Sequence, residues 1–572
     1  MWQRLFTLPL LGWCVFLFFS QSSTDQLPDF IPPVKGTVQL TGTFGELRGN
    51  HFHAGLDIRG GVGRPVYAIA DGYVSRIRVS VSGYGQALYL EHPSGHTSVY
   101  GHLDRFRDDI MAFTRERQYQ MESFLVDEEP TPEKFPVKQG DLIGYIGQRG
   151  YVSGPHLHFE IRDSRTERVL NPMNFGITVP DSRRPLVSLL RYYTVNERGQ
   201  VLNGKDMRLQ PLGGGRHGLR VDTLEVEHPT VAFAIKAYDQ QDGRPNRNGI
   251  YGLKMWQDDS LKFAYNMDGF LGERTRYLNA HLDYEEQQIN NSWMQRAFNL
   301  PGNGLDFYET DQQKGRIQLT PGQTSRIRFE ITDHRKNTSQ LEFVVRRNGS
   351  AVQAHHPVYT YFLPYNEESL IDNGELRAHF PDDALYEDLY LDYDYVPEAS
   401  EGLYAAVHRI HKSTIPLHRY FDLHIAPTRL PEYLNDKAII AHCEDGRSPV
   451  SYGGEWTREG RLRAPVRSLG NFTIMADTVP PTITVERFSA NMRGWESFSF
   501  RLSDNFPTAG KARDLRFRAE VDGQWILMEY DGRKRRLYHE FEGKIPPGEH
   551  ELVLRVVDDR GNETVYQKRF TR

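Results

Sequence analysis

The sequence is nearly free of cysteine, and this scarcity limits the kinds of site that the protein can build. Its 572 residues include 2 cysteines, Cys14 and Cys443. Cys14 lies in an N-terminal apolar run that we expect to be removed, which would leave Cys443 without a partner for an internal disulfide. A disulfide-stabilised scaffold and a thiolate-ligated metal centre are therefore excluded. We expect Cys443 to be a small buried apolar side chain.

Long apolar runs are scarce as well. The run over residues 5–19 follows Arg4 and precedes the small polar residues 20–23. This order is typical of a secretory signal peptide, here residues 1–22, and the run is short for a membrane span. We therefore expect an exported protein, periplasmic or associated with the cell envelope, with no stable membrane span after the signal is cleaved.

The chain has no excess of basic residues. It carries 69 lysines and arginines against 75 aspartates and glutamates, a net charge of −6 at pH 7 with histidine neutral. Proteins that bind nucleic acid depend on positive charge to neutralise phosphates. We expect no nucleic-acid partner.

Two short histidine motifs carry the chemistry that the sequence does offer. The later one, His156-Leu157-His158, follows the turn signal Gly154-Pro155. Polar and apolar residues alternate through it, which is typical of a strand with an apolar back. Side chains at positions i and i+2 of a strand point the same way, so both imidazoles can reach one point.

The earlier motif places Asp57 four residues after His53. That spacing would suit a helix, but the glycines and the proline over residues 55–65 favour a turn that leads into a short strand. His53, Asp57 and one imidazole of the later motif supply two nitrogens and one carboxylate oxygen, which leaves a fourth zinc position open for water. Either motif alone is more often a surface or core feature, so the combination carries this interpretation.

Across residues 38–176 the chain resembles the lysostaphin/LytM type of zinc metallopeptidase, the peptidoglycan endopeptidases of family M23. The resemblance rests on both histidine motifs, on residues 42–45, on Pro65-Val66-Tyr67-Ala68 and on Tyr100-Gly101-His102-Leu103. It implies one Zn²⁺ per catalytic domain, with every metal and catalytic position filled. The implied metal ligands are His53, Asp57 and His158, and the implied catalytic residues are His156 and His102.

The chemistry that needs these residues is amide hydrolysis. Zinc acidifies a water and polarises the scissile carbonyl, and imidazole can move protons near neutral pH. His156 is the natural proton acceptor, whereas His102 would either stabilise the developing oxyanion or share the proton transfer. The sequence leaves that division of roles open.

We interpret the other polar residues near these motifs as surface residues. We expect His51 at the rim of the site and His92 exposed beside a turn. Glu160 shares the strand face of His158 and could orient that ligand. Because glutamate prefers exposure, we expect a solvated strand end instead.

The family pattern is interrupted between residues 107 and 134. Asp108 and Asp109 can cap the start of a helix. The apolar residues that could line one side of this helix are Ile110, Met111, Met121, Phe124 and Leu125. Such an insertion beside His102 would form either a wall of the substrate groove or a helical decoration of the surface, and both alternatives stay open.

Beyond residue 180 the sequence becomes a series of alternating strands with turn signals. The stretch 321–337 corresponds to the stretch 547–562, which indicates two related sandwiches with a common terminal hairpin. The last module, which opens at residues 477–483, resembles bacterial immunoglobulin-like modules. We expect the modules to fold independently of the catalytic domain and to act as spacers or binding surfaces, with a protein partner as one possibility.

The predicted fold is mainly β, with a LytM-type antiparallel β catalytic domain, a helical insertion and β-sandwich (Ig-like) modules. The predicted division is a signal peptide at 1–22, the peptidase domain at 23–180 with its insertion at 107–134, a β-sandwich module at 181–346, a β-rich module at 347–476 and an Ig-like β-sandwich module at 477–572.

The predicted function is zinc-dependent hydrolysis of peptide cross-links in bacterial peptidoglycan, with the peptide stems as the binding partner. The alternative is a non-catalytic LytM-fold regulator or wall-binding protein. Such a protein would have no need to keep all five ligand and catalytic residues. A purely structural protein of β modules would leave the histidines unexplained.

Overall fold

The computed structural model describes residues 28–150, 152–349, 357–397, 400–444 and 446–572. The predicted signal peptide lies outside these residues. Within them, no helix combines the length and the apolar character that crossing a membrane requires. Strands dominate the chain, which confirms the mainly β prediction.

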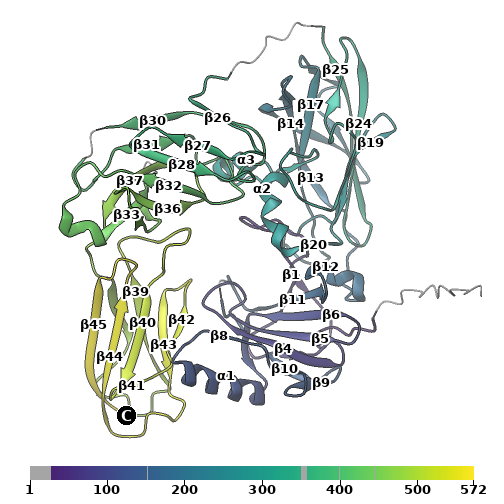
Figure 1. Cartoon of the computed structure of the whole chain (residues 1–572). Coiled ribbons are helices and arrows are strands. Elements are labelled where there is room, and N and C mark those ends of the chain that lie inside the picture. The colour runs from purple at the N-terminus through teal and green to yellow at the C-terminus, as the bar shows by residue number, and fades with distance from the viewer. Residues whose placement is uncertain (1–27, 151, 350–356, 398–399, 445) are drawn as a thin grey trace, which may run out of the picture.

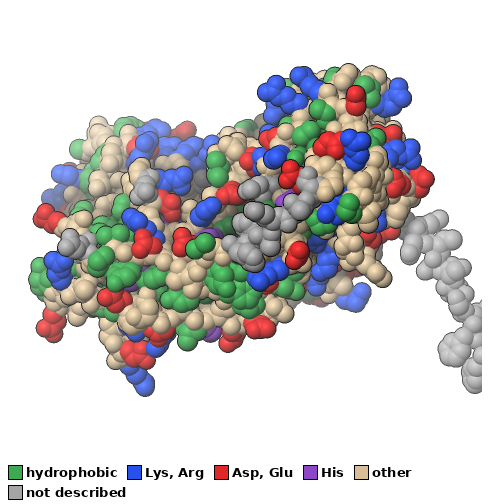
Figure 2. Space-filling view, turned by 90° about the horizontal axis from the view of Figure 1, so that it is seen from above, with side chains coloured by type: hydrophobic (Ala, Val, Ile, Leu, Met, Phe, Trp, Pro, Cys, Tyr) green, Lys and Arg blue, Asp and Glu red, His purple; other side chains and the backbone are tan. Residues whose placement is uncertain are grey.

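The strands fall into successive units that follow one another around a ring (Figure 1). We call them the N-terminal unit (28–180), the second unit (181–349), the third unit (357–476) and the last unit (477–572). The last unit returns to the N-terminal unit and lies beside its helix α1. On the face seen in Figure 2, basic and acidic side chains are interspersed, as the small net charge suggests.

The N-terminal unit is built on an antiparallel sheet with the strand order β1-β2-β11-β6-β5-β4-β8. A smaller sheet, β3-β10-β7, completes the unit. The bounds are β1 (Leu40–Gly42), β2 (Leu56–Arg59), β3 (Pro65–Tyr67), β4 (Gly72–Val79), β5 (Gln86–His92), β6 (His96–Gly101), β7 (Leu103–Phe106), β8 (Val126–Glu128), β9 (Pro136–Val137), β10 (Leu142–Ile146), β11 (His156–Asp163) and β12 (Arg168–Leu170).

Strand β11 shows why this sheet can hold a polar site. Its apolar face, with Leu157 and Phe159, is fully buried in the core. The opposite face carries His158 and Glu160, which are also buried. Both faces of β11 are therefore covered, and the polar face is shielded from water.

The insertion forms the helix α1 (Asp108–Met121), followed by β8. The expected caps, Asp108 and Asp109, lie in the first turn, and Arg107 precedes the helix. Negative charge there favours the helix through its dipole. Ile110 is buried, but Met121 and Leu125 are exposed, so the expected apolar face is shorter than the sequence suggested.

The second unit holds one large sheet in the order β21-β17-β13-β14-β15-β25-β24-β18-β19-β22. Its elements are β13 (Leu186–Val195), β14 (Val201–Gly213), β15 (Arg216–Leu219), β16 (Thr223–Val226), β17 (Thr230–Tyr238), β18 (Gly252–Gln257), β19 (Ser260–Asn266), β20 (Gly269–Leu271), α2 (Leu278–His281), α3 (Tyr284–Asn290), β21 (Gln295–Arg296), β22 (Tyr308–Thr310), β23 (Ile317–Gln318), β24 (Thr324–Thr332) and β25 (Thr338–Arg347).

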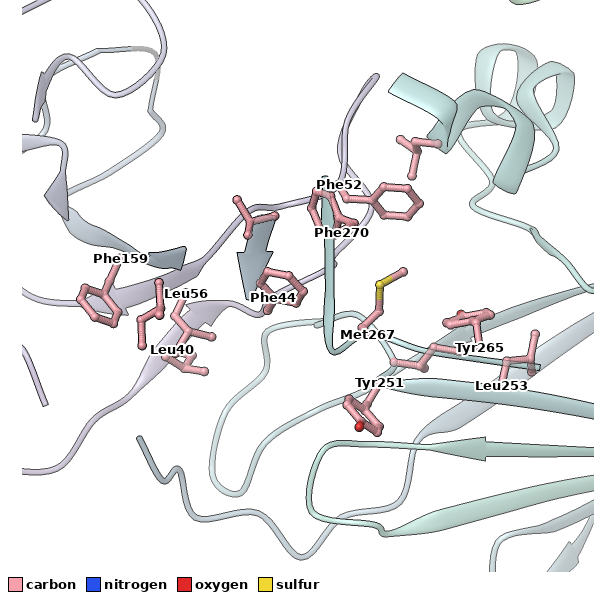
Figure 3. Close-up of a cluster of buried hydrophobic side chains, with 14 of the residues drawn as sticks. Leu40, Phe44, Phe52, Leu56, Phe159, Tyr251, Leu253, Tyr265, Met267 and Phe270 are labelled. Carbon is pink, nitrogen blue, oxygen red and sulfur yellow. The ribbon is translucent and has the colours of Figure 1, made fainter. Parts of the chain in front are cut away.

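The first two units share a core, which corrects the expectation of independent folding. Strand β20 of the second unit pairs with β12 of the N-terminal unit. The ring of Phe270 lies 5.3 Å from that of Phe44 and 5.6 Å from that of Phe52, centroid to centroid. Figure 3 shows this contact, and one continuous apolar cluster spans both units. Cutting the chain near residue 180 would expose these rings to water.

The third unit packs two sheets around its own core, β27-β28-β32-β36-β35 and β30-β31-β37-β33-β34. Its strands are β26 (Tyr361–Leu363), β27 (Ser369–Asp372), β28 (Leu376–Phe380), β29 (Leu389–Leu391), β30 (Tyr393–Val396), β31 (Val407–Ile410), β32 (Phe421–Ile425), β33 (Ala438–His442), β34 (Val450–Ser451), β35 (Glu455–Trp456), β36 (Leu462–Val466) and β37 (Gly470–Ala476).

The last unit also packs two sheets around a separate core, β38-β39-β43-β42 and β41-β40-β44-β45. The repeat predicted from the sequence is confirmed, because β24 and β25 form one hairpin and β44 and β45 form its counterpart. The strands are β38 (Thr482–Arg487), β39 (Ser497–Ser503), β40 (Arg516–Val521), β41 (Gln524–Trp525), β42 (Glu529–Asp531), β43 (Arg536–Glu540), β44 (Glu549–Val557) and β45 (Glu563–Thr571).

Candidate metal centre

Strand register brings the two histidine motifs together. His158 on β11 lies directly opposite Asp57 on β2 in the antiparallel ladder. Residues opposite each other in such a pair project to the same face of the sheet. The turn that carries His53 is held close to β11, since a Cβ at Gly55 would lie 2.2 Å from the carbonyl oxygen of Phe159. Glycine is therefore required between His53 and Asp57.

Three atoms converge at this point. Nε2 of His53 lies 2.9 Å from Oδ1 of Asp57 and 3.0 Å from Nδ1 of His158. Nδ1 of His158 lies 3.1 Å from the same Asp57 oxygen. All three residues are buried. The structure thus places His53, Asp57 and His158, as expected from the sequence, in a group that could hold a metal ion.

The remaining contacts of these residues test whether a cation fits. Nδ1 of His53 lies 2.7 Å from the carbonyl oxygen of Thr43, which can only accept, so Nδ1 carries the proton. Nε2 of a neutral His53 then presents a lone pair to the carboxylate oxygen of Asp57. Electron pairs that face one another at this distance repel unless a proton or a cation lies between them. The donor set therefore fits a metal ion such as Zn²⁺.

Without a metal, a proton on His158 takes this place. Burial alone would lower the pKa of His158, but hydrogen bonds to Asp57 and Glu160 and their charges raise the pKa of His158 to about 9. Burial would likewise raise the pKa of Asp57, yet the three surrounding histidines hold it well below its usual range. The pocket thus stabilises positive charge at the point where the three ligand atoms meet.

Glu160 corrects the sequence interpretation, because it is fully buried rather than a solvated strand end. Its Oε1 accepts a hydrogen bond from Nε2 of His158 at 2.8 Å, which orients the ring. Burial alone would raise the pKa of Glu160. The charge of Arg162 and the hydrogen bonds from His158 and Tyr84 nevertheless lower it to about 2, so Glu160 stays ionised.

Further residues around the ligands were not singled out from the sequence. The ring of Tyr84 stacks on that of His158 with centroids 5.0 Å apart, and its hydroxyl donates to Glu160. Arg48 donates to Oδ2 of Asp57 at 2.9 Å and so fixes the carboxylate. The alternation of His158 and Glu160 along one strand could have revealed the glutamate. Tyr84 and Arg48 give no comparable sequence signal.

His102 and His156 lie beside this group, with ring centroids 4.9 Å apart. Nδ1 of His102 donates to the carbonyl oxygen of Arg149 at 2.9 Å, and Nδ1 of His156 donates to that of Gly154 at 2.9 Å. Nε2 of His156 lies 3.4 Å from Oδ1 of Asp57. All five residues singled out from the sequence therefore meet at one place. Their individual roles remain predictions.

His102 is held in an unusual state. Its φ angle is 61°, in the left-handed region that a histidine seldom occupies, directly after β6. Burial first, and then the charges of His158 and His156, lower the pKa of His102 to about 3. The imidazole is therefore neutral at physiological pH, with a lone pair on Nε2.

The two other histidines considered in the sequence have different outcomes. His51 is exposed and lines a groove beside the metal centre. His92 is buried, and its two ring nitrogens contact the carbonyl oxygen of Asp71 and the hydroxyl of Ser98. The expectation that His92 is exposed is wrong, because it closes hydrogen bonds inside the sheet.

The groove beside the metal centre has a volume of about 640 Å³. Ala54, Tyr84 and Arg162 contribute from the N-terminal unit, and Phe270 and Thr275 contribute from the second unit. The hydroxyl of Thr275 accepts from the backbone N–H of Phe52, one residue before His53, at 2.8 Å. The second unit thus forms one wall of the groove.

Comparison with known proteins agrees with this site. Residues 51–112 match the model of the family described as Peptidase family M23, and residues 360–477 match that of the Zu5-like domain. The first match covers His53, Asp57 and His102.

Curated relatives are similar to about a quarter of the chain. The DD-carboxypeptidase/endopeptidase Mpg of Neisseria meningitidis is 30% identical over 129 residues, which cover 23% of this chain and 24% of that protein. The peptidoglycan DD-endopeptidase ShyC of Vibrio cholerae is 29% identical over 144 residues, 25% of each chain. The murein hydrolase activator NlpD of Escherichia coli is 30% identical over 133 residues, 23% of this chain and 28% of that protein.

The matched region spans about a quarter of the length of these relatives. Among solved structures, a zinc containing peptidase from Vibrio cholerae is 29% identical, over 26% of this chain and 40% of that one, with a TM-score of 0.20. The N-terminal unit of this chain therefore holds a Peptidase family M23 domain, and the third unit holds a Zu5-like domain.

Proposed function

We propose that the protein is a zinc-dependent endopeptidase that hydrolyses peptide cross-links of bacterial peptidoglycan. The observation that carries this proposal is the convergence of His53, Asp57 and His158 on one point, with His102 and His156 beside it. Two imidazole nitrogens and one carboxylate oxygen leave one position of a tetrahedral zinc ion open, as in catalytic sites. The relative named as a peptidoglycan DD-endopeptidase supports the substrate class.

Zinc at this site would supply the Lewis acid that polarises the scissile carbonyl and acidifies a water. The protein supplies the proton transfers. His102 and His156 each donate from Nδ1 to a backbone carbonyl, which leaves a lone pair on Nε2. Either ring can therefore accept the proton of the attacking water and return it to the leaving amine.

The neutral state of His102 favours one of the two roles that the sequence left open. With the proton on Nδ1, Nε2 of His102 cannot donate to a developing oxyanion until it has accepted a proton. We therefore assign His102 first to proton transfer, shared with His156, and only afterwards to stabilising the oxyanion. The lowered pKa of His102, about 3, keeps this ring neutral at pH 7 but also makes Nε2 a weak proton acceptor, so His156 is the main acceptor.

The groove supports a peptide substrate. It lies between the N-terminal and second units, and Ala54, next to His53, and Tyr84, which stacks on His158, line it. Its volume of about 640 Å³ suits an extended peptide segment. Glu273 lies in its wall and is exposed, which suits an amino group of a peptide stem. This function requires export to the cell envelope, in keeping with the predicted signal peptide at residues 1–22.

Digestion of purified sacculi tests the proposal. The zinc-loaded protein should release muropeptides that have lost a peptide cross-link, identified by mass spectrometry, and Asp57→Ala should release none. The name of the relative NlpD, a murein hydrolase activator, makes a non-catalytic role the alternative. If the zinc-loaded wild type releases nothing from sacculi or soluble cross-linked muropeptides, the non-catalytic alternative is favoured.

A further inference from the structure

Two groups of carboxylates lie outside the peptidase site. Asp181, Asp239 and Asp333 bring one oxygen each to within 4.8 Å of the others in the second unit. Asp477, Asp504 and Asp558 do the same in the last unit. Clustered acidic residues are common without a bound cation. These two groups differ from such clusters in their shared construction and in the carboxylate oxygens that lack a hydrogen-bond partner.

The two clusters have the same construction. Asp333, in the turn between β24 and β25, accepts hydrogen bonds from the backbone N–H of Asn337 at 2.8 Å and from its side-chain amide at 2.7 Å. Asp558, in the turn between β44 and β45, accepts the same pair of bonds from Asn562 at 2.8 and 2.7 Å. The repeat seen in the sequence therefore reproduces a side-chain arrangement as well as a hairpin.

The other members also correspond. The amide of Asn337 donates to the backbone carbonyl of Asp181, and the amide of Asn562 donates to that of Asp477. Asp181 and Asp477 each open their unit, directly after the segment that joins it to the preceding unit. The third members, Asp239 and Asp504, each follow the last residue of a strand, β17 and β39 respectively.

A buried oxygen in the first cluster is left unsatisfied. Asp239 is only 4% exposed, and its Oδ1 finds no hydrogen-bond partner among the described residues. Oδ1 of Asp504, a half-buried residue, also finds no partner among the described residues of the second cluster. A small cavity of about 30 Å³ adjoins the first cluster and is lined by Asp181 and Asp239. A buried carboxylate oxygen without a partner is costly unless a ligand satisfies it.

Among the described residues no basic side chain pairs directly with either cluster, and Arg335 and Lys437 act only at a distance, opposing the raised pKa values of Asp333 and Asp477. In the described part of the chain, none of the six aspartates forms an ion pair with lysine, arginine or histidine. Burial first, and then the neighbouring carboxylates, raise the pKa of Asp239 to about 8 and that of Asp504 to about 6. Each cluster therefore brings together carboxylates that no side-chain cation pairs with, and at neutral pH a proton on Asp239 offsets part of the charge of the first cluster.

We propose that each cluster binds one Ca²⁺ ion, so that a cation ties the start of the second unit and the start of the last unit to the strand ends on which they rest. Calcium takes carboxylate oxygens in flexible geometry, and an all-oxygen donor set does not suit the softer metals. Because Asp181 and Asp477 lie at the junctions between units, bound calcium would fix the angle at both junctions. This proposal is independent of the peptidase function.

Calcium titration of the full zinc-loaded protein tests the proposal. After passage over a chelating resin and reloading with zinc, titration with CaCl₂ in a calorimeter should show about two sites per chain. Calcium should also raise the midpoint of thermal unfolding by at least about 3 °C. Asp239→Asn and Asp504→Asn should each remove one site, and the double variant should remove both.

Asparagine has nearly the same size as aspartate and cannot repel its neighbours, so the variants should fold without calcium. Asp259→Asn is the matched control, since that side chain is 93% exposed and lies in a hairpin turn of the second unit. It should keep both sites. Wild type without calcium binding, or a double variant with unchanged binding, would overturn the proposal.

Terbium luminescence gives a second measurement that needs only single variants. Tyr251 lines the cavity next to Asp239 and can transfer excitation to Tb³⁺ bound there. Emission should appear on addition of TbCl₃, fall when CaCl₂ displaces the probe, and be lost in Asp239→Asn but kept in Asp504→Asn. Emission that calcium does not displace, or that survives Asp239→Asn, would place the ion elsewhere and contradict the proposal.

Discussion

Arg149, beside the metal centre, binds Glu529 of the last unit through its guanidinium group. Glu529 is buried, and it also accepts hydrogen bonds from Arg115 of α1 at 2.8 Å and from the hydroxyl of Tyr538 at 2.7 Å. The backbone carbonyl of the same Arg149 accepts from Nδ1 of His102. A single residue therefore connects a proposed catalytic histidine to a unit far along the chain.

This connection predicts that Glu529→Gln impairs the peptidase. Removing the buried anion takes a carboxylate from two guanidinium groups and leaves Arg115 with Glu542 and Arg149 with Asp104. This loss costs about 1–3 kcal/mol in docking the last unit. Hydrogen exchange should increase in α1 and at residues 147–150. Cleavage should fall by about tenfold, because misplacing a catalytic group slows a reaction steeply. Zinc content should not change. Glu368→Gln, at a side chain 70% exposed, is the control. Normal exchange and normal cleavage in Glu529→Gln would contradict the coupling.

Glu160→Gln should weaken zinc binding by about 10- to 100-fold, because a partner that orients a metal-binding histidine also raises its affinity for the metal. Competition with a chromogenic chelator measures this directly. Glu167→Gln is a matched control, since Glu167 also contacts Arg162 but its side chain is 67% exposed. Equal zinc affinity in the two variants would show that the Glu160–His158 hydrogen bond has no such role.

Zinc binding should release a proton at neutral pH. In the metal-free protein the pKa of His158 is raised to about 9, so the ring is protonated at pH 7, whereas a metal ligand must be neutral. At a pH below the pKa that His158 has in the unfolded chain, its raised pKa stabilises the folded metal-free protein in full. This contribution to stability is lost as the pH rises through about 9. Apparent zinc affinity should therefore increase by about tenfold per pH unit from 7 to 9. Calorimetry in buffers of different ionisation enthalpy counts the released proton, and a count of zero at pH 7 would contradict the assignment.

Phe270→Ala should destabilise the N-terminal unit although it lies in the second. Truncating a fully buried ring costs about 3–5 kcal/mol, and Phe270 packs on Phe44 and Phe52 next to His53. Thermal unfolding of the N-terminal unit, monitored through the release of zinc, should shift to lower temperature. The unfolding of the second unit should shift with it. Ile289→Ala is the control, since this side chain is 63% exposed. Zinc release at an unchanged temperature would show that the two units fold separately.

Local patterns in the sequence predicted most of the metal centre. The alternation around His156 and His158 predicted a strand. The glycines after His53 favoured a turn over a helix. Because Asp57 and His158 pair directly across two strands, the structure had little freedom to separate them. The terminal hairpins were predicted for the same reason, since their turns repeat within short stretches of chain.

Local sequence patterns could not predict the contacts between residues that lie far apart in the chain. Glu160 would follow the general preference of glutamate for solvent, but Tyr84, 76 residues earlier in the chain, covers it together with Arg162 of the same strand. The shared core through Phe270 and the contact of Arg149 with Glu529 depend on how the units turn back on one another. A strand pattern states which face is apolar, but not which unit covers it.

The most direct test of the account measures zinc content and cleavage side by side in the wild type, His158→Ala and His156→Ala. The account predicts about one zinc per wild-type chain and release of cross-linked peptides from sacculi. His158→Ala should lose both zinc and cleavage, since it removes a ligand. His156→Ala should keep zinc and lose about 100-fold or more in rate, as expected for a residue that moves the proton. Full zinc in His158→Ala, or near-normal cleavage by His156→Ala, would contradict it.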